Sequence, residues 1–270
     1  EPFDQMLFPV SRVPWPETWW EDEGFERREK EVLDILEHRL KTPTIAVILE
    51  PLVQGAGGMR MVRPEFLVEV EKRIHQANSL LITDEVLTGF GRCGALFAFQ
   101  RAGLKPDLIS LSKGLTGGFL PMGVTMASKK ISEGFLGEDP KQTFWHGHSF
   151  TANPLGCAAA NASLDLLEKS PQKYLDFESR HRPHLQQIVK GSRIECPRIT
   201  GTIAAFNIKV KDKKGYLSSV GKILKASALK NGVFIRPLGD VVYLMPPLCI
   251  TDEELEKCYF VIQEGLNSLF

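Results

Sequence analysis

The sequence lacks an excess of charge of either sign. Lysine and arginine together number 33, and aspartate and glutamate also number 33, so the formal net charge is zero. Proteins that bind nucleic acid non-specifically carry a basic excess, because contacts with phosphate supply most of that affinity. The charge balance therefore gives no support for a nucleic-acid partner.

Long apolar runs and paired cysteines are also missing. No apolar stretch approaches the roughly 20 residues that a membrane-spanning helix needs, so we expect no membrane partner. The five cysteines are scattered, without a C-x-x-C pair. The two histidines of His146-Gly147-His148 have no cysteine or acidic cluster nearby that would complete a metal site. We expect no metal, no disulfide framework and a reducing compartment, by default the cytoplasm, with an organelle as the alternative.

Strand and helix patterns alternate over the first part of the chain. Amphipathic spacing predicts helices at 24–40 and 64–78. Continuous apolar runs predict strands of a mostly parallel sheet, the first of them buried on both faces. These strands are predicted at 44–50, 80–84, 108–111 and 123–127. Together with a long helix at 153–169, they predict a large α/β domain over residues 1–169.

A different pattern follows a second helix at about 171–190. Helical spacing at 217–230 and 252–268 is mixed with short strand-like runs, which is typical of an α+β arrangement. The strand-like runs lie at 193–197, 202–210, 233–236 and 241–245. We predict a smaller C-terminal α+β domain over residues 170–270.

Three charged residues fall at the carboxyl ends of predicted strands: Glu50, Asp84 and Lys113. In parallel α/β sheets the ligand binds outside these ends. A lysine at a strand end is usually a solvated surface residue, and a lone aspartate is more often a cap or turn residue. A lysine and an aspartate on neighbouring strands are, however, what pyridoxal phosphate (PLP) chemistry needs. The lysine forms a Schiff base, and the aspartate keeps the pyridine nitrogen protonated.

A glycine pattern after Asp84 imitates a nucleotide-binding motif. Gly89-Phe-Gly91-Arg-Cys-Gly94 matches G-x-G-x-x-G, but the dinucleotide fingerprint places these glycines directly in the turn after a strand. Here residues 84–88 intervene, and no acidic residue lies about 20 residues further on. The pattern therefore predicts a mobile loop beside a cofactor pocket and argues against a nicotinamide site.

Two weaker motifs lie further along the chain. Ser149 and the backbone N–H groups of the loop at 146–149 could bind a phosphate. Arg236 ends a strand-like run, which suits bidentate binding of a carboxylate as well as it suits a surface ion pair. Spacing alone does not choose between these two roles.

The longer pattern around these residues resembles the class III PLP-dependent aminotransferases. Its main elements are Asp84-Glu85-Val86-x-x-Gly89-Phe-Gly91-Arg92 and Asp107-Leu-Ile-x-x-Ser112-Lys113-x-x-x-Gly117-Gly118. Further segments are similar to the branch of that family that serves biotin biosynthesis. These are Glu50-Pro51-Leu-Val-Gln54, His146-Gly147-His148-Ser149 and Arg236-Pro-Leu-Gly-x-x-x-Tyr243-Leu-Met. The resemblance runs from about Thr44 onward.

The resemblance implies a fold, a cofactor and residue roles. The fold would be the type I PLP-transferase fold, and the cofactor PLP. Lys113 would be the Schiff-base lysine and catalytic base, Asp84 the partner of the pyridinium, and Val86 a packing residue under the ring. Arg236 would bind the substrate carboxylate, and Tyr243 would line the substrate pocket.

The resemblance also implies a homodimer with its active site at the interface. His148 and Ser149 would reach the cofactor phosphate of the partner subunit, and Gly147 would lie near the substrate. The small-molecule partners would be an amino donor and a keto acceptor.

The implied reaction belongs to biotin biosynthesis. An amino group, from S-adenosylmethionine or from lysine, would pass to 8-amino-7-oxononanoate and give 7,8-diaminononanoate. Two alternatives stay open: an omega-aminotransferase of the ornithine or 4-aminobutyrate type, and an inactive fragment.

Family members have an N-terminal segment that these 270 residues do not match. It supplies a Gly-Ser phosphate cup, an aromatic residue that stacks on the ring, and substrate contacts. Residues 1–23 show no clear periodicity and contain Trp15, Trp19 and Trp20. We therefore expect that the chain begins within a larger domain, that it binds PLP weakly or not at all, and that it exposes an apolar face.

Overall fold

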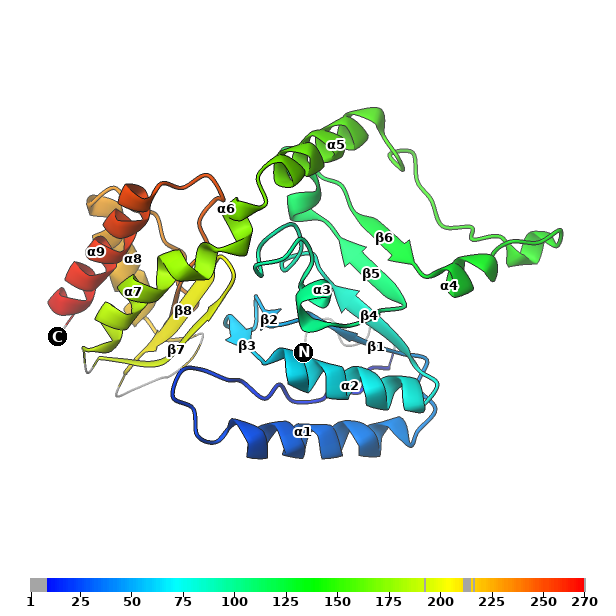
Figure 1. Cartoon of the computed structure of the whole chain (residues 1–270), viewed down its shortest axis with the longest axis horizontal. Helices are drawn as coiled ribbons and strands as arrows, with labels where there is room; N and C mark the ends of the chain where they lie inside the picture. The colour runs from blue at the N-terminus through cyan, green and yellow to red at the C-terminus, as the bar shows by residue number, and fades with distance from the viewer. Residues whose placement is uncertain (1–8, 192, 211–214, 216, 270) are drawn as a thin grey trace.

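The computed structural model describes residues 9–191, 193–210, 215 and 217–269. Part of the irregular N-terminal segment, residues 1–8, lies outside the described residues. The first part of the chain (Figure 1) contains α1 (Phe25–Leu40), β1 (Ala46–Leu49), β2 (Val53–Gln54), β3 (Arg60–Met61), α2 (Pro64–Gln76), β4 (Leu80–Asp84), α3 (Ala98–Ala102), β5 (Leu108–Leu111), η2 (Lys113–Thr116), β6 (Val124–Ala127), α4 (Lys129–Glu133), η3 (Pro140–Gln142) and α5 (Pro154–Lys169). The second part contains α6 (Gln172–Leu175), α7 (Phe177–Val189), β7 (Ile194–Thr200), β8 (Ile203–Ile208), α8 (Val220–Lys230), β9 (Val241–Leu244) and α9 (Asp252–Ser268).

A four-stranded sheet of order β1-β4-β5-β6 organises the first part. The strands β1, β4 and β5 are parallel, and β6 runs antiparallel to β5. Leu49 lies opposite Thr83, and Asp84 lies opposite Ser110, so the three parallel strands end at the same edge. The predicted α/β class with a mostly parallel sheet is confirmed.

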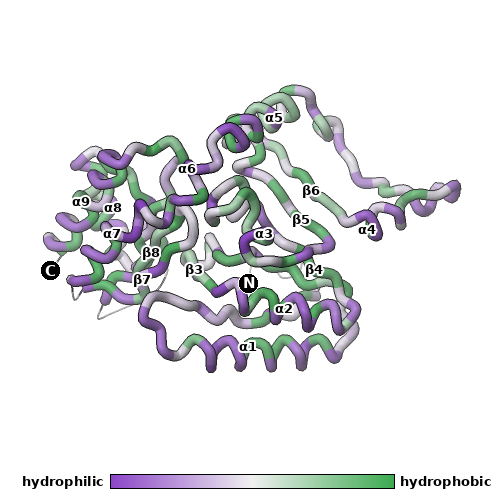
Figure 2. The backbone as a smooth tube through the Cα atoms, in the orientation of Figure 1, coloured by the Kyte–Doolittle hydropathy of each residue, from purple (hydrophilic) through white to green (hydrophobic). Residues whose placement is uncertain are grey.

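Helices α1 and α2 form a layer beside this sheet (Figure 1). Purple and green turns alternate along α1, as expected for a helix with one apolar face (Figure 2). Pro64 begins α2 at a position that needs no N–H donor. The side chains of α2 that fill the core are Phe66, Leu67, Val70 and Ile74. Each such fully buried side chain stabilises the fold by about 1.5–3 kcal/mol.

The prediction that the first strand is buried on both faces was wrong. Ile48 in β1 is 60% exposed, and Ile45 just before it is 87% exposed. The helix layer buries Leu49, but no described segment covers the side chain of Ile48. An apolar run indicates that both faces of a strand can be buried, but it does not identify the segment that covers each face.

A three-stranded antiparallel sheet of order β7-β8-β9 organises the second part. Helices α7, α8 and α9 pack with it around a separate core that includes Phe177, Ile208, Leu224 and Ile262. The predicted strand at 233–236 is absent from this described segment, although Val233 and Ile235 are buried. Those two side chains enter the core while the backbone around them joins no ladder. The domain boundary between residues 169 and 170 stays a prediction.

A buried histidine links three elements of the second part. His181 on α7 is fully buried, with Nδ1 2.7 Å from the Tyr259 hydroxyl and Nε2 3.0 Å from the Thr202 carbonyl oxygen. Because a carbonyl only accepts, Nε2 carries the proton and donates it, and Nδ1 accepts from Tyr259. Burial lowers the pKa of His181 from 6.5 to about 4.

This histidine should make the protein sensitive to acid. The unfolded chain binds a proton at His181 near pH 6.5, whereas the folded chain does so only near pH 4. Stability supplied by neutral His181 is therefore fully present above pH 6.5 and is lost as the pH falls toward 4, by about 3 kcal/mol. Urea denaturation of the wild type and His181→Gln at several pH values measures this difference, with exposed His38→Gln as control. Parallel stability curves for the wild type and His181→Gln would contradict the assignment.

Candidate active site

Glu50, Asp84 and Lys113 come together at the carboxyl edge of the parallel strands. The pairing of Leu49 with Thr83 brings Glu50 beside Asp84, and Lys113 follows β5 two residues after Leu111. Burial raises the pKa of the half-buried Glu50 carboxyl, and the charge of Asp84 raises it further. The hydrogen bond from Gly55 N–H and the charge of Lys113 act in the opposite direction. Asp84 and Lys113 therefore both lie within electrostatic reach of Glu50.

Asp84 presents one free carboxylate oxygen at this edge. Its Oδ1 accepts from the backbone N–H of Val86 at 3.0 Å. Its Oδ2 has no hydrogen-bond partner among the residues that the structure describes. A half-buried carboxylate with a free oxygen is suited to accept a hydrogen bond from a protonated ring nitrogen. This geometry fits the pyridine nitrogen of PLP.

Lys113 has a fixed backbone and a free side chain. Ser112 Oγ donates to the Met122 carbonyl at 2.7 Å, and Ser163 Oγ donates to the Gly114 carbonyl at 2.9 Å. These two bonds hold the residues on either side of Lys113, whose own φ is +45°. The exposed Nζ atom has no hydrogen-bond partner within the described ranges. The amine is therefore available to a ligand at a defined place.

The glycine loop after Asp84 is buried, so the prediction of a mobile loop was wrong. Phe90 is 5% exposed, and Cys93 is fully buried. Thr202 N–H donates to the Arg92 carbonyl at 2.8 Å, and Arg92 Nη1 donates to the Pro246 carbonyl at 2.5 Å. The loop therefore joins the first part of the chain to the second, and its glycines allow this close packing.

Glu85 holds the start of this loop, and the sequence analysis gave it no role. Its fully buried carboxylate accepts from Thr88 Oγ1 at 2.7 Å, from Ala98 N–H at 3.1 Å and from Phe99 N–H at 2.7 Å. Burial raises the pKa of Glu85, and these hydrogen bonds oppose that rise. A second acidic residue directly after Asp84, at the end of the apolar run that begins at Leu80, was the available signal.

Arg236 and Tyr243 lie close together in the second part. Burial raises the pKa of the half-buried Tyr243 phenol, and the charge of Arg236 lowers it. Arg236 itself is exposed. The turn at 55–58 links this region to the segment that contains Glu50, because Gly58 packs against Val241 of β9.

Arg198 ties the same turn to the second part of the chain. This arginine on β7 is 3% exposed. Its Nε donates to the Met59 carbonyl at 2.7 Å, and its Nη2 donates to the Gly58 carbonyl at 2.8 Å. Two turns, one between β2 and β3 and one after β4, therefore meet the second part of the chain through arginine side chains.

Gly147, His148 and Ser149 lie away from these residues. They belong to the arm, which we define as residues 129–153 and which extends from the sheet between β6 and α5 (Figure 1). All three are exposed. His148 bonds only locally, since its N–H donates to Thr151 Oγ1 and its Nδ1 accepts from Phe150 N–H. Within one chain, the arm does not complete the site of Lys113.

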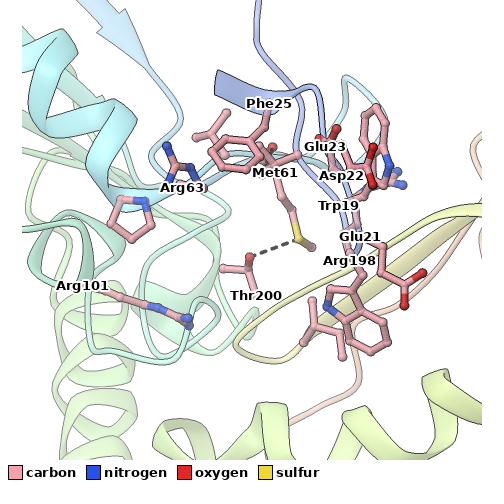
Figure 3. Close-up of a pocket in the computed structure, with 15 residues that line it drawn as sticks. Trp19, Glu21, Asp22, Glu23, Phe25, Met61, Arg63, Arg101, Arg198 and Thr200 are labelled. Carbon is pink, nitrogen blue, oxygen red and sulfur yellow. Dashed lines mark hydrogen bonds between the residues drawn. The ribbon is translucent and has the colours of Figure 1, made fainter. Parts of the chain in front are cut away.

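A cavity of about 530 Å³ opens elsewhere, between the N-terminal segment, α2 and β7. Figure 3 shows its lining, which includes Trp19, Met61, Arg63, Arg101 and Arg198. Each of these arginines already binds an acceptor of the chain: Arg63 pairs with Glu29, and Arg101 pairs with Glu178. The cavity includes none of the strand-end residues, so we do not assign it to the reaction.

Known proteins are similar to this chain in both sequence and fold. The family model for class III aminotransferases matches residues 1–266, which includes the first 43 residues, where the resemblance of the sequence is weak. The adenosylmethionine-8-amino-7-oxononanoate aminotransferase of Synechococcus elongatus is 50% identical over 269 residues. The enzyme with the same name from Geobacter sulfurreducens is 38% identical over 281 residues. A solved structure described as "Transaminase with L-ala" superposes with a TM-score of 0.88 at 26% identity, covering 99% of this chain and 67% of that one.

The matches cover nearly all of this chain but only part of the relatives. The two curated relatives align with 99% of the chain, which spans 63% and 62% of their own lengths. The structural neighbour confirms the type I PLP-transferase fold that the motifs predicted. The match over residues 1–266 establishes that the chain belongs to the class III aminotransferase family.

Proposed function

We propose that this chain carries the reactive lysine of a PLP-dependent aminotransferase. The observation that carries the proposal is the placement of Lys113 and Asp84 at the ends of adjacent parallel strands, each with an atom free for a ligand. Family membership supports PLP as the ligand. When bound, PLP supplies an electron-accepting ring that stabilises negative charge at a substrate carbon.

The residues at the strand ends have distinct roles in this proposal. Lys113 Nζ would hold the cofactor, and as a free amine it would move a proton at the carbon that bears the substrate nitrogen. Asp84 Oδ2 would accept a hydrogen bond from the pyridine N–H and favour its protonated form. Val86, whose N–H donates to Asp84 Oδ1, would pack against the ring face.

The substrates are inferred from the relatives and from the second part of the chain. Two relatives are named for adenosylmethionine and 8-amino-7-oxononanoate, and we propose the same donor and acceptor here. Arg236 would bind the acceptor carboxylate, and Tyr243, which lies near that guanidinium, would line the pocket. We place this activity in the cytoplasm.

An amine-donor panel tests the substrate assignment. With excess PLP and 8-amino-7-oxononanoate as acceptor, S-adenosylmethionine should give 7,8-diaminononanoate, which mass spectrometry detects. If lysine is the better donor, the assignment of the acceptor stands and the assignment of the donor changes to lysine. Activity with ornithine or 4-aminobutyrate alone would replace the biotin-pathway assignment with the omega-aminotransferase alternative. Inactivity toward every donor in a folded protein that binds PLP would contradict the proposal.

We propose a homodimer in which the arm completes the site of the partner. Its aromatic residues Phe144, Trp145 and Phe150 are 62%, 79% and 76% exposed. Apolar patches on this scale mark interaction surfaces, and buried interface cores are rich in aromatic residues. Since His148 and Ser149 lie among these residues, docking of the arm on a second copy would bring them to the partner's cofactor phosphate.

A further inference from the structure

The backbone of Lys113 adopts an unfavourable conformation at the position that carries the reactive amine. Its φ is +45°, in the left-handed region that residues other than glycine rarely adopt. Such a residue persists only where the surrounding structure fixes it, and residues of this kind cluster at active sites. The contacts on either side of Lys113 therefore decide where its side chain begins.

Two serine side chains hold the residues on either side of Lys113. Ser112 Oγ, just before it, donates to the Met122 carbonyl at 2.7 Å. Ser163 Oγ donates to the carbonyl of Gly114, just after it, at 2.9 Å. Ser112 is a neighbour of Lys113 in the chain, whereas Ser163 belongs to α5 and lies 49 positions beyond Gly114. The second bond therefore makes the conformation of Lys113 depend on a distant helix.

Ser163 is a polar residue on the face of α5 that packs on η2. Ala160 and Leu164 of α5 share an apolar cluster with Leu115 of η2. Ser163 follows Ala160 by one turn of the helix and is half-buried. A hydroxyl group in such a place needs a hydrogen-bond partner, and the partner of Ser163 is the Gly114 carbonyl. The specific contribution of Ser163 is thus its bond to the segment that follows the lysine.

The turn that begins at Lys113 has little room to rearrange. The Gly118 N–H donates to the Lys113 carbonyl at 3.1 Å, and the Gly117 N–H donates to the Gly114 carbonyl at 3.0 Å. An added Cβ at Gly114 would lie 2.7 Å from Phe90 Cβ in the glycine loop. The turn is therefore held between that loop on one side and α5 on another.

We propose that Ser163 is a positioning residue for Lys113, which keeps Lys113 in its left-handed conformation and so fixes the amine at the reactive edge, the edge that Lys113 shares with Asp84. The inference rests on the proposed function, because a fixed amine matters only if Lys113 binds PLP. Ser163→Ala removes the hydroxyl group, and Ser163→Thr retains one. Ser227→Ala is the matched control, since Ser227 is a half-buried serine on α8, in the second part of the chain.

Hydrogen exchange without PLP tests whether Ser163 holds the turn. The Gly118 N–H, which donates to the Lys113 carbonyl, should exchange about tenfold faster in Ser163→Ala. It should stay within about twofold of the wild type in Ser163→Thr and be unchanged in Ser227→Ala. The amides of β8 in the same samples show whether a variant is destabilised as a whole. Equal Gly118 exchange in the wild type and Ser163→Ala would overturn the inference.

Trapping of PLP tests whether Ser163 positions the amine. Borohydride reduction fixes PLP on the lysine that holds it, and mass spectrometry then identifies that lysine. At one limiting PLP concentration, Ser163→Ala should lower the fraction trapped at Lys113 about tenfold, because a misplaced amine loses the advantage of a fixed position. Ser163→Thr should restore trapping, and exposed Lys105 is the reference for non-specific labelling. Equal trapping at Lys113 in the wild type and Ser163→Ala would contradict the positioning role.

Transamination separates this role from the proposed function. Ser163→Ala should lower kcat about tenfold and leave the KM for the amine donor within about twofold, because Lys113 moves a proton after the donor has bound. If PLP is trapped at Lys113 in the wild type but no donor is used, the proposed function fails and the role of Ser163 stands. If the wild type is active and Ser163→Ala changes neither exchange nor trapping, the role of Ser163 fails and the proposed function stands.

Discussion

Replacing Lys113 with alanine is expected to lower transamination by about 10⁴-fold or more, because one amine serves as both nucleophile and base. The visible absorbance of lysine-linked PLP should disappear at the same time. Folding should be unaffected, since the Lys113 side chain is exposed and makes no hydrogen bond to the described part of the chain. Absorbance titration with PLP and a coupled activity assay measure both effects, and Lys105→Ala serves as the control.

Mixing two inactive variants extends this experiment to the dimer. Ser149→Asp places a negative charge at the proposed phosphate contact and should also inactivate the enzyme. If Ser149 serves the partner's site, a mixed dimer of Lys113→Ala and Ser149→Asp has one intact site. Random reassociation should then restore about a quarter of wild-type activity. If verified mixed dimers recover no activity, Ser149 and Lys113 either serve a site within the same subunit or do not share a site.

Replacing Gly201 with alanine should destabilise the protein by about 3 kcal/mol, through overpacking and a left-handed backbone. Gly201 has a φ of +57° at the turn between β7 and β8. An added Cβ would lie 2.3 Å from the Cys93 carbonyl carbon, 2.3 Å from Gly94 N and 2.5 Å from the Arg92 oxygen. These are backbone atoms, so no side-chain rotation relieves the contact. Thermal unfolding should show a fall of about 6–12 °C in Tm.

Gly103→Ala separates the two causes of this loss. Gly103 has a φ of +73°, but nothing lies within 4 Å of the position of an added Cβ. Its replacement should cost only the conformational strain, about 1 kcal/mol. A Gly201→Ala variant no less stable than Gly103→Ala would show that the glycine loop and the β7–β8 turn do not pack as described.

The sequence was sufficient for the elements whose identity depends on local pattern. The runs that became β4 and β5 placed Asp84 and Lys113 at strand ends, and Pro64 marked the start of α2. The strand-end rule for parallel sheets then brought Asp84 and Lys113 to one edge. The pairing of these two residues follows from strand order, which alternating strands and helices predict well.

The features that depend on distant segments could not be predicted from local sequence patterns. The exposure of Ile48 reflects which segments cover the sheet, and the burial of Phe90 reflects its packing with Leu115 and Ala160, which lie on other elements. Val233 and Ile235 have the apolar alternation of a strand, but no neighbouring strand pairs with them. Ser149 lies on the arm, which we propose docks on a second copy of the chain. In each case the local pattern is compatible with several tertiary partners.

Arg198 also bears on how substrate preference could change. Its hydrogen bonds to Gly58 and Met59 connect the C-terminal sheet with the turn that Glu50 holds through Gly55. A substitution in β7 would therefore displace the reactive edge without touching a substrate. In a selection for new amine donors, we expect variants at Arg198 or its neighbour Asn207 to arise beside the obvious changes at Arg236 and Tyr243. Substrate preference would then depend in part on β7, through the hydrogen bonds of Arg198 to Gly58 and Met59.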